Sequence, residues 1–101
     1  MITTDLVRFH LAHSHWALEQ ILNHLETLPF ETIERDMGIG PGSLRENIAH
    51  TIEAMFYFAD NFAGREYVER EEFAARAASV AGLRGLLAEA QSGLSAALLA
   101  A

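Results

Sequence analysis

The side chains with the widest range of chemistry in this sequence are five histidines, all of them in the first half of the chain. One of them, His50, follows Glu46 by four residues and precedes Glu53 by three. Residues three or four apart are neighbours on a helix surface, so these three side chains can project towards one ion. Imidazole with carboxylate suits Zn, Fe, Ni or Mn. The same stripe is typical of a solvated helix surface, and the sequence leaves both interpretations of His50 open.

The other four histidines fall in one amphipathic segment near the start of the chain. On a helical wheel of about 100° per residue, His15 lies on the polar face, and we expect it to face solvent. His10, His13 and His24 lie within the apolar arc, so we expect interior imidazoles or a polar cleft inside a bundle. A substitute metal site formed by His10, His13 and His50 would require the two helical stripes to meet. The apolar arc also contains Leu6, Phe9, Ala17, Ile21, Leu25 and Leu28.

The remaining composition argues against several classes of function. There is no cysteine, which excludes disulfides and thiolate metal sites. The net charge is −7 without a basic cluster, so neither nucleic acid nor an anionic membrane is an expected partner. No Gly-x-Ser-x-Gly motif is present. The glycines of 38–42 precede a helix but lack the lysine of a phosphate-binding loop, and we interpret them as a flexible turn.

Three helical segments account for most of the chain, so we expect one all-α domain over residues 1–101. The first runs from about 4 to 28 and is followed by Pro29. A proline disfavours the α conformation in the residue that precedes it, so we expect the helix to end there. The second runs from 43 to 63, and the third from about 80 to the end. We expect a loop over 30–42. The charged stretch 65–78 is compatible with either a loop or a short helix.

Capping residues and apolar faces support these segments. Ser43 and Glu46 form a capping-box pattern at the start of the second helix, and Gly64 supplies a left-handed stop. Ser79 can cap the third helix, whose glycines make it dependent on tertiary packing. The expected apolar face of the second helix is Leu44, Ile48, Ile52, Met55, Phe56, Ala59 and Phe62, and that of the third is Leu83, Leu87, Leu94 and Leu98.

Residues 42–50, Gly-Ser-Leu-Arg-Glu-Asn-Ile-Ala-His, and the opening His-Ser-His-Trp-Ala of 13–17 resemble the DinB/YfiT-like superfamily. The resemblance covers about residues 5–67. It implies an up-down-down-up four-helix bundle with a long crossover, commonly dimeric. It further implies a divalent metal, often Ni or Zn, held by three histidines, and thiol-dependent transferase or isomerase activity. The first metal ligand of that family corresponds to His50.

The sequence departs from this pattern after His50. No histidine follows it, so the His-x-x-x-His pair of the family is missing, and a fourth helix is not apparent. We therefore expect about three long helices, an incomplete Ni or Zn site at His50, and an apolar groove that a helix of a second copy fills in a homodimer. One functional hypothesis is a relative of the thiol transferases, with a small thiol as partner. The alternative is a non-catalytic helical interaction or dimerisation module, and the sequence does not decide whether the protein is an enzyme. Without a signal peptide or an apolar span, we expect a cytoplasmic protein.

Overall fold

The computed structural model describes residues 3–100, and over that range it is helical and contains no strand. Its long helices are α1 (Thr4–Leu25), α3 (Leu44–Phe62) and α5 (Val80–Leu99). Two short helices, α2 (Phe30–Glu34) and α4 (Phe73–Arg76), lie in the connections between them. The expected all-α fold with three long helices is therefore confirmed for the described residues.

The helix starts follow the predicted capping residues. The Ser43 hydroxyl accepts the backbone N–H of Glu46 at 3.0 Å, and the Glu46 carboxylate accepts the N–H of Ser43 at 3.3 Å. Ser79 caps α5 by accepting the N–H of Gly82 at 3.0 Å. Gly64, at φ 78°, follows the end of α3 in the left-handed conformation. These bonds satisfy N–H groups that have no partner within the helix.

Two helix boundaries differ from the prediction, and the structure decides the alternative that the sequence left open for residues 65–78. The helix α1 ends at Leu25 rather than Leu28, because residues 26–28 tighten into a turn before Pro29. The predicted loop 30–42 begins instead with α2, since Pro29 is well suited to a helix start and Ile33 is buried in the core. In the charged stretch 65–78, only 73–76 is helical, and Phe73 is the buried side chain that anchors it.

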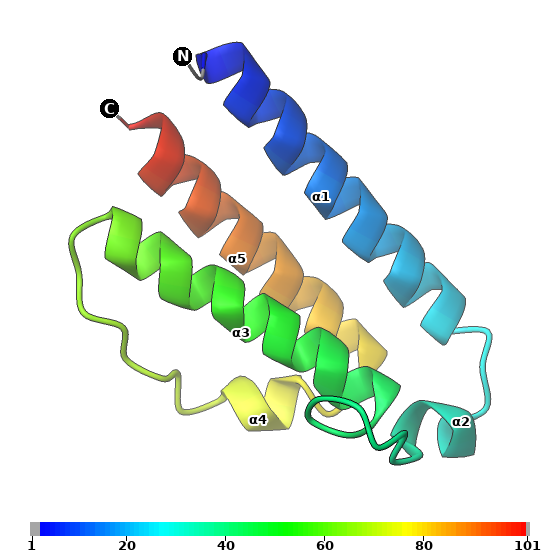
Figure 1. Ribbon diagram of the computed structural model, residues 1–101. Helices are drawn as coiled ribbons and strands as arrows, with labels where there is room; N and C mark the ends of the chain where they lie inside the picture. The colour runs from blue at the N-terminus through cyan, green and yellow to red at the C-terminus, as the bar shows by residue number, and fades with distance from the viewer. Residues whose placement is uncertain (1–2, 101) are drawn as a thin grey trace.

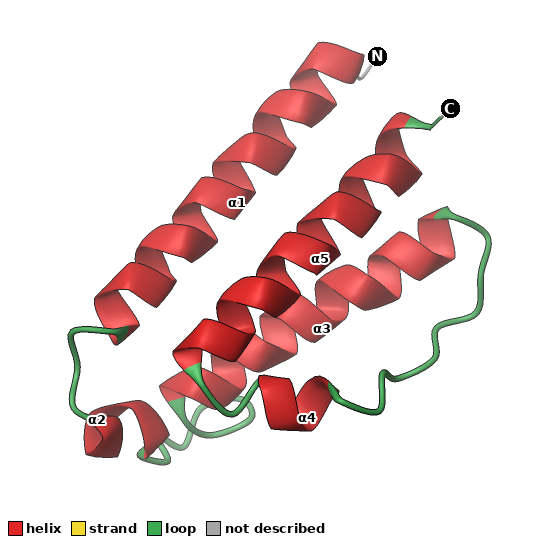
Figure 2. Ribbon diagram, turned by 180° about the vertical axis from the view of Figure 1, so that it is seen from behind, coloured by secondary structure: helices red, strands yellow, loops and turns green. Residues whose placement is uncertain are grey.

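The three long helices form a trough with α5 as its floor (Figures 1 and 2). Both α1 and α3 pack along α5, whereas they scarcely touch each other. In Figure 1, α1 runs opposite to α3 and α5, which run in the same direction. The parallel pair requires the chain to return along the outside of α3, which it does between residues 63 and 79.

The returning segment is held by one buried carboxylate. Asp60, 7% exposed, receives a hydrogen bond from Arg65 at 3.0 Å and lies 3.6 Å from the Arg70 guanidinium. The same Arg70 guanidinium lies over the ring of Phe56, 4.0 Å from its centroid. Burying a carboxylate is costly unless it is paired, and these two arginines provide the pairing.

The hydrophobic core occupies the end of the trough that α2 and α4 close. The predicted core faces of α3 and α5 are confirmed at Ile52, Phe56, Leu83 and Leu87, all under 5% exposed, but Phe62 is 56% exposed. Both termini of the described chain lie at the opposite end of the trough (Figure 1). The core consists of Leu22, Leu25, Ile33, Ala49, Ile52, Phe56, Phe73, Ala77, Leu83, Leu86, Leu87 and Ala90.

Candidate functional site

His50 lies on the exposed side of α3, facing away from α5. It lines two adjoining shallow hollows, and Glu53 and Glu69 line both of them with it. The Tyr67 hydroxyl closes one hollow by donating to Oε2 of Glu53 at 3.1 Å. Burial of the Tyr67 side chain, followed by this hydrogen bond and the charge of Glu53, raises the pKa of Tyr67.

Two of the carboxylates beside His50, Glu46 and Glu53, are already engaged within the protein. Glu46 is in the capping box with Ser43, and Glu53 accepts the Tyr67 hydroxyl. Between residues 3 and 100, no three His, Cys, Asp or Glu side chains are grouped so that they could hold one metal ion. The residues present therefore do not fit the three-ligand Ni or Zn site that the DinB-like resemblance implies. His50 as a metal ligand stays a prediction without a supporting cluster.

The predicted orientation of α1 is wrong by about 100°, which is the step of one residue on a helix. His10, His13 and His24, expected in the interior, are exposed. His15, expected in solvent, is half-buried; its Nε2 pairs with Glu19, and its Nδ1 is buried without a partner among the described residues. The reason is that α1 packs on one helix only, so a single stripe is covered. That stripe contains Val7, Leu11, His15, Leu18, Leu22 and Leu25.

The histidines of α1 and α3 do not meet. His10 lines the groove between α1 and α3, whereas His50 lines the separate hollows beside Tyr67 and Glu69. The substitute site formed by His10, His13 and His50 is therefore not assembled, which corrects that hypothesis. His13 instead lies between two aromatic rings, with ring centroids 6.3 Å from Phe9 and 5.9 Å from Trp16.

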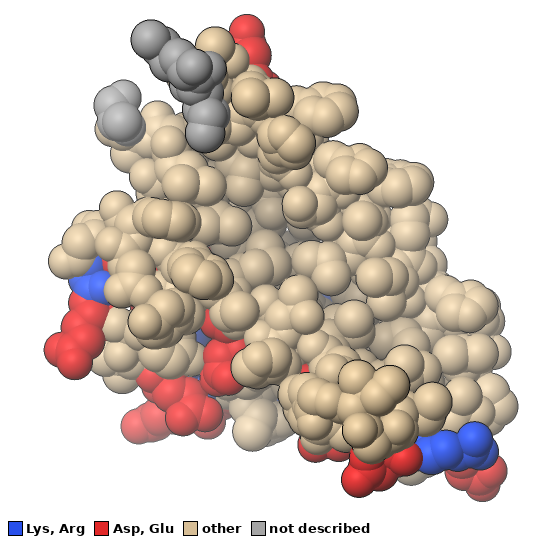
Figure 3. Space-filling model, viewed as in Figure 1, with Lys and Arg blue, Asp and Glu red and all other residues tan. Residues whose placement is uncertain are grey.

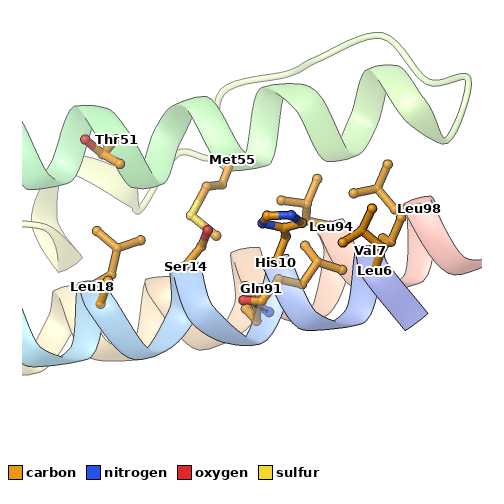
Figure 4. Close-up of a pocket in the computed structure, with 12 residues that line it drawn as sticks. Leu6, Val7, His10, Ser14, Leu18, Thr51, Met55, Gln91, Leu94 and Leu98 are labelled. Atoms are coloured by element: carbon orange, nitrogen blue, oxygen red, sulfur yellow. Dashed lines mark hydrogen bonds between the residues drawn. The ribbon is translucent and has the colours of Figure 1, made fainter. Parts of the chain in front are cut away.

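A groove lies between α1 and α3, and its volume of about 660 Å³ exceeds that of either hollow beside His50. His10 and Met55 point into it from opposite walls, and Leu94 and Leu98 of α5 lie along its floor (Figure 4). Its lining, all within the described residues, includes no Asp, Glu, Lys or Arg. The lining residues are Leu6, Val7, His10, Leu11, Ser14, Ala17, Leu18, Thr51, Met55, Gln91, Leu94 and Leu98.

Large apolar side chains remain exposed on the helices that flank this groove. Phe9 and Trp16 of α1 are 64% and 58% exposed, and Phe58 and Phe62 of α3 are 50% and 56% exposed. Figure 3 shows the face seen in Figure 1, hollowed at its centre and with few charged residues there; these gather along its lower and left edges and at its top. Clustered exposed apolar surface is typical of interaction sites.

Sequence reasoning missed these exposed aromatics. It assigned Phe9 and Phe62 to the core because apolar side chains at helical spacing normally face inward. A usable signal was nevertheless present: apolar residues cover most of the circumference of the first helix, which is more than a single neighbouring helix can bury.

Comparison of the chain with protein-family models, with curated proteins and with solved structures finds no match. None of the helices in the described part of the chain combines the length and the apolar character that a membrane span requires. We therefore base the function on the geometry of the groove and of the hollows around His50.

Proposed function

We propose that this protein is a non-catalytic helical interaction module that receives the apolar face of a partner helix in the groove between α1 and α3. The observation that carries the proposal is the groove lining without Asp, Glu, Lys or Arg, together with the exposed Phe9, Trp16, Phe58 and Phe62 on its flanking helices. Leaving such a surface in water is unfavourable by roughly 25 cal/mol per Å² of apolar area. A partner that covers it recovers this free energy.

The shape of the groove supports a helix as the occupant. On α1 the lining extends from Leu6 to Leu18. At 1.5 Å per residue, this is roughly 18 Å, or more than three helical turns. In a four-helix bundle each helix lies against two neighbours around a shared core. A helix seated between α1 and α3, above the Leu94 and Leu98 side chains of α5, would complete that arrangement.

A DinB-like bundle lineage is part of this proposal. The antiparallel α1 and the parallel pair α3 and α5 have the order of directions that the resemblance implies for the first three helices of such a bundle. The capping box at Ser43 also lies where the DinB-like motif begins. We also propose that the protein is cytoplasmic.

A metal-dependent thiol transferase or isomerase is the second candidate. Its support is the accessible ring of His50 in hollows shared with Glu53 and Glu69. The interaction module is favoured because Glu46 and Glu53 are already engaged, while the groove is larger and unfilled.

The proposal can be tested with a designed peptide and the single tryptophan of the chain. The probe is an amphipathic helix of about four turns, with leucines on one face, balanced Glu and Lys on the other, and no aromatic residue. At sub-micromolar protein we expect saturable binding, reported by a blue shift of Trp16 fluorescence. Thr51→Arg should weaken binding at least about tenfold, because it places a charge in the groove at an exposed helix position.

The matched control is Asn61→Arg, which makes the same charge change at an exposed position of α3 outside the groove lining. It should bind the peptide as the parent protein does. Equal affinity of the Thr51→Arg and Asn61→Arg variants, or no binding of the peptide at all, would overturn the proposed function.

A further inference from the structure

We infer that the helix received in the groove is α1 of a second copy of this chain, in a reciprocal twofold dimer in which each copy completes the bundle of the other. This inference rests on the proposed function, because it uses the same groove. It adds the identity of the partner, the helix that is inserted and the side chains that meet at the symmetry axis.

The first argument is that α1 offers both halves of such an interface. One side of α1 forms a wall of the groove through Leu6, His10 and Ala17. The adjoining outward side exposes Phe9 and Trp16, which point away from α5 because the α5-facing stripe is Leu11, Leu18 and Leu22. A twofold interface requires one surface to be complementary to itself, and a helix that is both wall and insert meets this requirement.

The second argument is the area available. A fully exposed aromatic side chain presents about 150–250 Å². The exposed fractions of Phe9, Trp16, Phe58 and Phe62 therefore amount to roughly 350–550 Å² per copy. Two copies, together with Leu6 and Ile21 at 43% exposure each, reach the ~1,200 Å² at which specific interfaces begin.

The third argument is charge. The chain carries a net charge of −7, so two copies repel each other wherever their acidic residues approach. The groove has no Asp, Glu, Lys or Arg among its described lining residues, and charged residues lie towards the edges of that face (Figure 3). An interface on this face thus keeps most of the acidic groups apart. Salt should strengthen the dimer, because it screens the remaining repulsion and there are no interface ion pairs to weaken.

The spacing along α1 predicts the register of the dimer. Phe9 and Trp16 are seven residues apart, two helical turns, and His13 stacks between them. An antiparallel α1 pair centred between these two aromatics places Phe9 of each copy beside Trp16 of the other. It also brings the two His13 side chains close to the symmetry axis.

Sedimentation provides the first test. At about 100 μM, well above the micromolar dissociation constant expected of a small apolar interface, we expect a species of twice the 11.1 kDa chain mass. Phe9→Glu should weaken the dimer at least tenfold, because it places a charge in the apolar interface. The matched control Ala88→Glu, at an exposed position of α5 outside the groove lining, should change it less than twofold. Circular dichroism of both variants verifies that the helices are retained.

Disulfide trapping tests the register, and the absence of native cysteine makes single-cysteine variants unambiguous. Under mild oxidation His13→Cys should form a covalent dimer, whereas Glu19→Cys, on the other side of α1, should not. Equal cross-linking of the two variants, or a dimer unaffected by Phe9→Glu, would overturn the inference.

A chain that sediments only as a monomer at about 100 μM also overturns the inference, since this interface should be occupied at that concentration. The proposed function survives that result if the designed leucine peptide still binds the monomer and Thr51→Arg abolishes binding. If the protein is monomeric and also fails to bind the peptide, both the inference and the proposed function are wrong.

Discussion

The Arg45 side chain, in the first turn of α3, donates Nε–H to Oε2 of Glu34 in α2 at 2.6 Å. Its Nη1 donates to the backbone carbonyl of Ala77, just after α4, at 3.1 Å. One guanidinium therefore joins three segments at the closed end of the trough. The hydrogen bond to Glu34 is the main reason that the pKa of Arg45 is raised, opposed by burial.

Arg45→Lys should lower the free energy of unfolding by about 1–2 kcal/mol. Lysine keeps the charge, but its single ammonium cannot reproduce the fork that reaches two acceptors in different segments. The Arg45 and Glu34 side chains are 21% and 25% exposed, so solvent screens part of their attraction. Urea unfolding measures the difference. Arg8→Lys, on the exposed polar side of α1, is the control, and an equal loss in both variants would contradict this role of Arg45.

Two glycines in α5 should respond in opposite directions to alanine. A Cβ at Gly82 would overlap the Arg76 carbonyl oxygen and lie 2.7 Å from its carbon, whereas a Cβ at Gly93 would lie 3.8 Å from Cβ of Ala59. Gly82→Ala should destabilise the protein by about 1–3 kcal/mol, because α4 must move. Gly93→Ala should stabilise it by about 0.5–1 kcal/mol through helix propensity. Thermal unfolding of the two variants measures both signs, and stabilisation by Gly82→Ala would refute the close approach of α4.

Alkaline pH should weaken the contact between Tyr67 and Glu53. Burial and the Glu53 carboxylate raise the pKa of Tyr67 in the folded state above its value in the unfolded chain. The contribution of the neutral phenol is therefore complete below about pH 10 and is lost as the pH rises through the raised pKa. The stability difference between the parent and Tyr67→Phe should shrink over this interval. Urea unfolding at stepped pH measures it, and a difference independent of pH would contradict the shift.

Metal content separates the two functional hypotheses. We expect the untagged protein, after loading with Ni or Zn, to hold well below one ion per chain, and His50→Ala to leave that value unchanged. A catalytic zinc site takes three protein ligands, and two of the carboxylates beside His50, Glu46 and Glu53, are already engaged. Elemental analysis gives the stoichiometry. A full equivalent of metal that is lost in His50→Ala would instead favour the metal-dependent alternative.

The sequence predicted the parts of the fold that local chemistry determines. The Ser43 and Glu46 capping box and the Leu83 and Leu87 face of α5 have the expected geometry. The orientation of α1 was not predictable in this way, because Phe9 and Trp16 are as apolar as Leu11 and Leu22. Which of them is buried depends on where α5 lies, a tertiary fact that a single helical wheel does not contain.

In the candidate site, too, the features set by local spacing were predictable, whereas those set by tertiary packing were not. His50, Glu46 and Glu53 were identified from spacing, and they do line one hollow on α3 together. That Glu53 is engaged by Tyr67, fourteen residues away, depends on the path of the returning segment and could not be read from the helix alone. An apolar groove was expected from a pattern of three long helices, but its walls, including His10, followed only from the orientation of α1.

Because α1 packs mainly on α5, its two ends should differ in how readily they unfold locally. Of the buried side chains of α1, Leu22 and Leu25 belong to the main core cluster and lie near the C-terminal end of the helix, whereas Leu11 lies outside that cluster. The N-terminal turns of α1 therefore have the least buried apolar surface to lose when their hydrogen bonds break. In the isolated chain, amide hydrogens of these turns should exchange with solvent deuterium well before those of α3 and α5. Amide hydrogens near the α2 end of the same helix should exchange only when the hydrophobic core itself opens.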